Sequence, residues 1–269
     1  MNKTTVRRIL LVLLLLIFVV STGWIAAVRL RYRASREKYA DAAAQYAEPA
    51  GRTPLPQNAL PVGENPEIVA AEESSSEDQP PITINFDKLR EKSSAVVGWI
   101  YCEGTVINYP VVQAPDNDFY LERDYTGAYD PSGAIFTDEA DNPGFVDSNT
   151  IIYGHHMADM SMFASLEYWL EEDYFRAHPV MWLLTPEQNY RVELFSVYST
   201  VATSETYTIY YQPRQEFDNY LRQAKAWSLY RTEVELESDA HYVVLSTCAY
   251  NYDEGRTVLH GKLVPVPAM

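Results

Sequence analysis

Basic side chains are scarce over most of this chain. Of the 21 Lys and Arg residues, 8 fall within residues 1–38, where a single acid leaves a net charge of +7. Residues 39–269 hold the other 13 basic side chains against 36 acidic ones, a net charge of −23. Because phosphate binding needs a basic surface, this deficit excludes nucleic acid as a partner. The negative net charge of residues 39–269 is explained by solubility alone.

Cysteine is almost absent as well, with only Cys102 and Cys248. The count alone leaves one disulfide between them open. The sequence also lacks the close-spaced Cys-x-x-Cys or His-x-x-x-His pairs that are usual for zinc ligands. A zinc site built from His155 and His156 with Cys248 or His178 is therefore the weaker interpretation of these residues. We expect no metal and no cofactor.

The one long hydrophobic run lies near the N-terminus. Residues 9–28 form an uncharged stretch of 20 residues, long enough as a helix to cross a bilayer. Basic residues flank both ends, so the positive-inside rule leaves the orientation open. A signal peptide is the alternative, but the run exceeds a usual h-region and basic residues follow it at once. We predict an uncleaved single-pass anchor at 9–28, within an N-terminal segment of residues 1–38.

Residues 39–81 read as a linker between this anchor and one globular domain. They contain seven of the 16 prolines and the acidic cluster at 72–78, without a sustained helical or strand period. The first part, to about residue 47, is rich in Ala, Arg and Glu and is expected to continue the membrane helix for a few turns. The domain is predicted at 82–269, which is long enough for one core of normal size.

The pattern of this domain is mainly β. Aromatic residues make up 13% of the chain, including 21 Tyr, which favours a β-rich fold. Helical spacing occurs at 85–92, 161–169 and 215–230. Eight strand-like segments stand at 96–102, 105–112, 134–137, 150–153, 180–184, 190–198, 241–247 and 257–264. They predict a closed or nearly closed eight-stranded β-barrel with helical insertions.

Three reactive residues stand at the edges of strand-like segments. Cys248 ends the run that begins at His241, Arg256 follows eight residues later, and His155 ends an apolar run at 151–155. A thiolate is a strong nucleophile, an imidazole exchanges protons near neutral pH, and a guanidinium stabilises an oxyanion. Together they are the parts of a thiol acyl-transfer site. Cys102, on an alternating stretch, is expected to be a small half-buried hydrophobe.

His155 and His156 compete for the role of the base. Successive side chains of an extended strand point to opposite faces, so only one of the two can face Cys248. The residues alone do not decide between them.

These segments resemble the sortases, the membrane-anchored cysteine transpeptidases of Gram-positive bacteria. Leu245-Ser-Thr-Cys248 is similar to the family's Leu-x-Thr-Cys, and Arg256 stands where the family's arginine is expected. Residues 149–155 resemble the histidine strand, which makes His155 the match. Residues 98–113, 116–121 and 153–163, with the long helix before the last strands, point to class B. The resemblance covers essentially all of residues 82–265.

The resemblance implies a sortase barrel behind a transmembrane helix, with His155, Cys248 and Arg256 as catalytic residues. It implies a substrate groove lined by Asn117, Leu121, Tyr153, Thr203, Tyr207 and Ser246. Ala249 follows the cysteine where some class B members carry an acid, so no contact of that acid is carried over. No EF-hand-like carboxylate spacing is present, and calcium dependence is not expected.

The implied partners are the sorting-signal peptide of secreted surface proteins, a lipid-linked cell-wall precursor amine and the plasma membrane. The catalytic domain would be extracellular.

Two other functions use the same features. A membrane-tethered thiol peptidase is one, although papain-like enzymes place the cysteine before the histidine, whereas His155 precedes Cys248 by 93 residues here. The other is a non-catalytic surface-binding domain, for which the three reactive residues would be incidental. Product analysis with and without an amine acceptor separates the first alternative from a transpeptidase.

Overall fold

The computed structural model describes residues 3–50, 79–208, 214–248 and 254–266. The chain divides into two compact units, residues 1–41 and 42–269. The first unit is helical, formed by α1, which spans Lys3–Tyr46. Side chains from Leu10 to Val20 in this helix are 49–69% exposed.

Within the described residues, one helical stretch, Leu10–Tyr46, is long and apolar enough to cross a membrane. A signal sequence would meet the same criterion. The helix continues to Tyr46, as the composition of this segment predicts. Most of the predicted linker, residues 51–78, lies outside the described residues.

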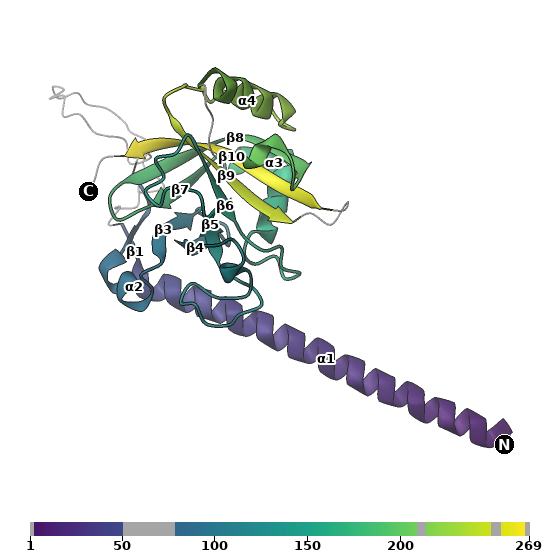
Figure 1. The fold of residues 1–269 in the computed structure, drawn as a ribbon. Helices are drawn as coiled ribbons and strands as arrows, with labels where there is room; N and C mark the ends of the chain where they lie inside the picture. Colours follow the sequence, from purple (N-terminus) through teal and green to yellow (C-terminus); the bar gives the residue numbers. More distant parts are fainter. Residues whose placement is uncertain (1–2, 51–78, 209–213, 249–253, 267–269) are drawn as a thin grey trace, which may run out of the picture. The chain divides into compact units, whose positions relative to one another are not determined.

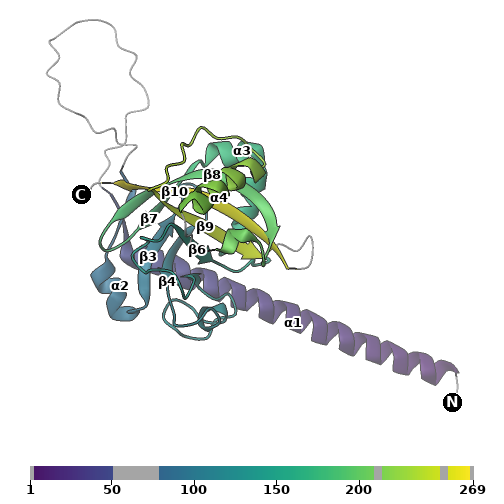
Figure 2. The ribbon, with the colours of Figure 1, turned by 45° about the horizontal axis from the view of Figure 1, so that its top comes forward.

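Eight strands close into a barrel, which confirms the predicted fold class (Figures 1 and 2). Around the barrel the order is β10-β8-β7-β3-β4-β5-β6-β9. The pairs β4–β5 and β6–β9 are parallel, and the others are antiparallel. The strands are β3 Val96–Tyr101, β4 Asn108–Val112, β5 Ile135–Thr137, β6 Asn149–Tyr153, β7 Val180–Leu184, β8 Asn189–Val201, β9 His241–Cys248 and β10 Gly255–Val266.

The remaining elements include several that the sequence did not predict. Two three-residue strands, β1 and β2, pair with each other, and helix α3 precedes β7. The segment predicted as a helix at 161–169 is a 3-10 helix, η3. These elements are β1 Ala47–Pro49, β2 Ile82–Ile84, α2 Phe86–Lys92, η2 Phe119–Leu121, η3 Ala164–Leu170, α3 Glu172–Ala177, η4 Glu205–Tyr207 and α4 Arg214–Trp227.

Strand β4 starts at Asn108 rather than at the predicted residue 105. The Thr105 hydroxyl donates to the Cys102 carbonyl at 2.9 Å and accepts from the Ile107 N–H at 3.1 Å. Gly104 has a φ of 75° within this loop. The Thr105 N–H also donates to the Cys102 carbonyl at 3.3 Å, so residues 102–105 form a tight turn, and the side-chain bonds of Thr105 delay the start of β4.

Helix α4 covers one face of strands β6, β8, β9 and β10 (Figures 1 and 2). Its buried side chains recur at helical spacing, at Phe217, Tyr220, Leu221 and Ala224. They pack in one core cluster with strand residues that include Ile151, Val244 and Val258. The cluster fixes which face of β6, β9 and β10 lies under the helix, and hence which side chains share that face.

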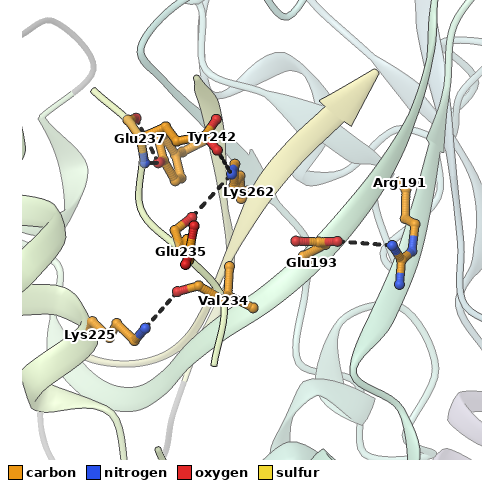
Figure 3. A network of polar contacts seen from close by, with 8 residues as sticks. All are labelled: Arg191, Glu193, Lys225, Val234, Glu235, Glu237, Tyr242 and Lys262. Carbon is orange, nitrogen blue, oxygen red and sulfur yellow. Dashed lines mark hydrogen bonds and ion pairs between the residues drawn. The ribbon is translucent and has the colours of Figure 1, made fainter. Parts of the chain in front are cut away.

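Residues 231–240, which we call the strap, close the cover beside α4. The strap has no regular secondary structure, yet Thr232, Val234 and Leu236 are half-buried while the residues between them are exposed. Two lysines tie its backbone down: Lys225 donates to the Val234 carbonyl at 2.6 Å and Lys262 to the Glu235 carbonyl at 3.1 Å (Figure 3). This end of the face is therefore sealed from solvent.

Candidate active site

Strand register brings the three reactive residues into one row. Antiparallel pairing of β9 and β10 sets Arg256 opposite Cys248. Parallel pairing of β6 and β9 sets Tyr153 opposite Ser246, and the Gly154 N–H donates to the Ser246 carbonyl at 3.1 Å. His155, past the end of β6, and Cys248, the last residue of β9, each follow two residues after that pair, so the register sets them side by side.

Alternation along the strands shows that this row lies on the face covered by α4. Val244 belongs to the core cluster under the helix, and Ser246 and Cys248 follow it at intervals of two. The same step leads from Ile151 through Tyr153 to His155. One end of this face is therefore part of the core under α4, and the other end carries the reactive residues.

A groove of about 230 Å³ opens at this uncovered end. It is walled by five segments: the loop after β4, strand β5, the end of β6, the end of β9 and the start of β10. Its lining residues are Asn117, Leu121, Phe136, Tyr153, Gly154, His155, Ser246, Thr247, Cys248 and Arg256. Cys248, His155 and Arg256 are each half-buried, so they are reachable yet held by the wall.

Two glycines allow the His155 ring to occupy its position. A Cβ on Gly154 would lie 2.5 Å from Ile135 Cδ1 and 2.7 Å from Phe163 Cγ. A Cβ on Gly133, whose φ is 62°, would lie 2.8 Å from His155 Cδ2. Larger residues at either site would displace the ring or its strand. His155 Nε2–H donates to the Leu121 carbonyl at 2.6 Å, which fixes the ring orientation.

The neighbouring His156 has a different environment. Its Nε2 lies 3.0 Å from a carboxylate oxygen of Glu167 on η3. Its partner is therefore in the helical insertion rather than in the groove, as expected when successive side chains of an extended segment diverge. This geometry favours His155 as the imidazole of the site.

The two cysteines are free thiols in different surroundings. Cys102 is buried, and its Sγ lies 3.6 Å from the Val180 carbonyl oxygen. Burial raises the pKa of the Cys102 thiol to about 12, against a weaker opposing hydrogen bond from Thr105. It stays protonated at neutral pH and is a poor nucleophile. The disulfide that the count left open does not form in this structure.

Five of the six predicted groove residues gather at the site. Asn117, Leu121, Tyr153 and Ser246 line the groove. The Tyr207 hydroxyl lies 2.7 Å from Ser246 Oγ, and the Tyr207 ring stacks on Tyr153 with centroids 6.2 Å apart.

Thr203 differs from the other five predicted groove residues. It is exposed in the turn after β8, and within the described part of the chain it is not among the residues that line the groove. The family resemblance alone was the signal for it. Tyr207, at the end of η4, is the residue of this segment that reaches Tyr153 and Ser246.

Sequence reasoning missed Phe136, Thr247 and the buried Asp138 beside the groove. Phe136 packs on Tyr153 with ring centroids 5.3 Å apart.

Within the described residues, no three His, Cys, Asp or Glu side chains lie close enough to hold a metal ion. The zinc interpretation therefore finds no cluster among these residues.

A thiol, an imidazole and a guanidinium in one groove at the rim of a closed barrel are the parts of a cysteine acyl-transfer enzyme. Comparison with known proteins places the chain within that class. The family model for the sortase domain matches residues 100–264. The chain therefore belongs to the sortase family, whose members are cysteine transpeptidases.

Its relatives point to the class B branch. Sortase B of Listeria monocytogenes is 38% identical over 178 residues, covering 65% of this chain and 72% of that protein. Sortase B of Staphylococcus aureus is 30% identical, covering 71% of this chain and 79% of that protein. The crystal structure of sortase B from B. anthracis in complex with AAEK1 superposes with a TM-score of 0.69 at 33% identity, covering 88% of this chain and 99% of that one.

Proposed function

We propose that this sortase cleaves the C-terminal sorting signal of secreted surface proteins and joins them to a cell-wall amine through a thioacyl enzyme on Cys248. The row formed by His155, Cys248 and Arg256 above the groove carries the proposal. Three side chains from three strands meet there, and each supplies one part of acyl transfer.

The first half of the reaction forms the thioacyl enzyme. The Cys248 thiolate attacks the carbonyl carbon of a Thr residue in the bound peptide, and a carbon–sulfur bond forms. Arg256 donates N–H groups to the oxygen that becomes negatively charged. Protonated His155 gives its proton to the leaving amine as the carbon–nitrogen bond breaks.

The second half releases the product. A cell-wall amine attacks the thioester carbon, and His155 takes up the proton that this amine loses. The carbon–sulfur bond breaks, and the Cys248 thiolate returns. No oxidant or cofactor is needed, because one amide bond is exchanged for another.

Substrate selection is proposed to lie in the groove wall. Asn117, Leu121, Tyr153 and Ser246 face the bound peptide, and Tyr207 holds Ser246 and Tyr153 in place. This combination offers hydrogen-bonding groups beside an apolar surface, as an extended peptide requires.

The apolar helix supports a membrane anchor with the catalytic domain outside the cell. The wall lies outside, and a lipid-linked acceptor and an inserted substrate share the same membrane. Tethering the enzyme there raises the effective concentration of both. Protease shaving of intact cells should release the domain. Digestion only after lysis would contradict this orientation.

The test uses the full chain in detergent and a quenched fluorescent peptide library with one fixed Thr. We expect cleavage after Thr, a thioacyl adduct on Cys248 detectable by mass, and product transfer to added hydroxylamine. Cys248→Ala should form no adduct. Cleavage that yields only the free acid in the presence of excess amine would instead indicate a thiol peptidase.

A further inference from the structure

We propose that Asp138 is the positioning residue that sets the hydrogen-bonding polarity of the groove wall, acting through Asn117 and Tyr153. The inference rests on the proposed function, because it concerns how the same groove holds its peptide. Asp138 does not line the groove itself; it stands behind two side chains that do.

The carboxylate of Asp138 joins two segments of the wall. Its Oδ2 accepts from Asn117 Nδ2 at 3.0 Å and from the Tyr153 hydroxyl at 2.9 Å. Asn117 belongs to the loop after β4, whereas Tyr153 ends β6. Asp138 is only 8% exposed, so these bonds to a charged acceptor are shielded from water.

Asp138 is itself held rigidly. Its Oδ1 accepts from the Ala140 N–H at 3.0 Å. Its backbone N–H donates to the Ile151 carbonyl, and its carbonyl accepts from Gln113 Nε2 at 2.9 Å. The backbone of Asp138 is thus anchored to β6 and to the residue that follows β4, and its carboxylate serves as a fixed acceptor for the groove residues.

The bonds to Asp138 leave each of the two groove side chains with one hydrogen-bonding role. Tyr153 donates its only hydroxyl proton to Asp138, so towards the groove its hydroxyl oxygen can only accept. Asn117 donates one N–H of its amide to Asp138, and its Oδ1 accepts from the Glu139 N–H at 2.8 Å. Its second N–H is then the group left for the groove.

The wall therefore presents a donor from Asn117 beside an acceptor from Tyr153. An amide group of a peptide complements this pair, because its carbonyl accepts and its N–H donates. Removing the charge of Asp138 would leave one oxygen for three donors. Either Tyr153 would turn away or the Asn117 amide would flip and lose its bond to Glu139.

The experiment is a double-mutant cycle of Asp138→Asn and Tyr153→Phe on the full chain, assayed with the library peptide that the parent enzyme cleaves fastest. We expect Asp138→Asn to lower kcat/KM by about 10-fold to 100-fold, as for the loss of a charged hydrogen bond. In the Tyr153→Phe background the loss from Asp138→Asn should be several-fold smaller, because the two act as one unit.

Two controls separate positioning from general damage. Asp124→Asn removes a different buried carboxylate, in the β4–β5 loop, which accepts from the Thr126 and Ala128 N–H groups, and should leave kcat/KM within about 2-fold. Alkylation of Cys248 by iodoacetamide does not use the groove wall and should proceed at the parent rate in Asp138→Asn.

Turnover of the library by the parent tests the proposed function alone, and only ratios of variant to parent test Asp138. Parent-like kcat/KM in Asp138→Asn would overturn the inference. So would losses that multiply independently across the cycle. A fall in alkylation rate and melting temperature that parallels the fall in turnover would assign Asp138 a purely structural role.

Discussion

The face shared by β6, β9 and β10 places a histidine at each of its two ends, and the surroundings of these two histidines are opposite. At the end sealed by α4, His260 is 1% exposed and lies 2.7 Å from the Tyr220 hydroxyl. Burial lowers the pKa of His260 to about 3, so the ring is neutral at physiological pH. At the uncovered end, His155 borders a groove. Whether helix α4 covers the histidine therefore decides its role: His260, under the helix, is structural, and His155, at the uncovered end, is placed for catalysis.

The largest effect should come from the thiol at the open end. Cys248→Ala removes the nucleophile, and we expect no detectable thioacyl adduct or peptide turnover. Cys102→Ala is the matched control, since it removes a buried thiol from another part of the barrel. It should retain turnover per folded molecule. Activity in Cys248→Ala would break the comparison at its most important point.

The imidazole of the open end comes next. His155→Ala should lower turnover by about 10²–10⁴-fold, the range for loss of a general acid and base. His156→Ala removes the neighbouring ring that pairs with Glu167 and should cost far less. Steady-state kinetics on both variants decide the matter. If His156→Ala were the inactive variant, the face assignment would be wrong.

A smaller loss is expected from Arg256→Lys. The guanidinium offers a planar fork of donors, whereas the ammonium is a single point charge on a flexible stem. We expect kcat and kcat/KM to fall by about 10²–10³-fold, as when one oxyanion donor is removed. Melting curves should match the parent, because the side chain is at the rim. Near-normal turnover would reduce the site to a Cys–His pair.

The sealed end should respond in stability rather than in turnover. His260→Ala removes the buried hydrogen bond between the imidazole and the Tyr220 hydroxyl and opens a cavity under α4. We expect a loss of about 2 kcal/mol in the free energy of unfolding and a melting temperature lower by about 4–8 °C. Turnover per folded molecule should stay within about 2-fold of the parent. A large fall in kcat without a change in melting would show that the two ends are coupled.

The smallest effect depends on pH. Burial raises the pKa of Asp141 to about 8, and the charges of Asp138 and Asp147 add to this. The folded chain therefore keeps a proton that the unfolded chain loses near pH 4, so stability falls as pH rises between these values. Asp141→Asn should raise the melting temperature by a few degrees at pH 9 and by little at pH 5. An equal shift at both pH values would contradict the sign.

Sequence patterns predicted the barrel because its strands alternate or run apolar between clear breaks. They also placed Cys248 and His155 at strand ends, which is where the register later brings them together. The β1–β2 pair was missed because three residues carry no period. Asp138 was missed because its partners, Asn117 and Tyr153, are far from it in sequence and only the closed barrel assembles them. Thr203 was expected from the family resemblance, and in the structure it is exposed in the turn after β8 and is not among the residues that line the groove.

The parallel pairing of β6 with β9 also has a consequence for when reactivity arises. His155 and Cys248 are 93 residues apart, and they become neighbours only when β9 docks beside β6. Contacts this distant in sequence close late, because the intervening loop must first lose its entropy. A nascent chain whose β9 has not docked therefore carries the Cys248 thiol without the His155 imidazole beside it. The proposed site is assembled only when the barrel is complete, so acyl transfer by Cys248 must wait until the domain has folded.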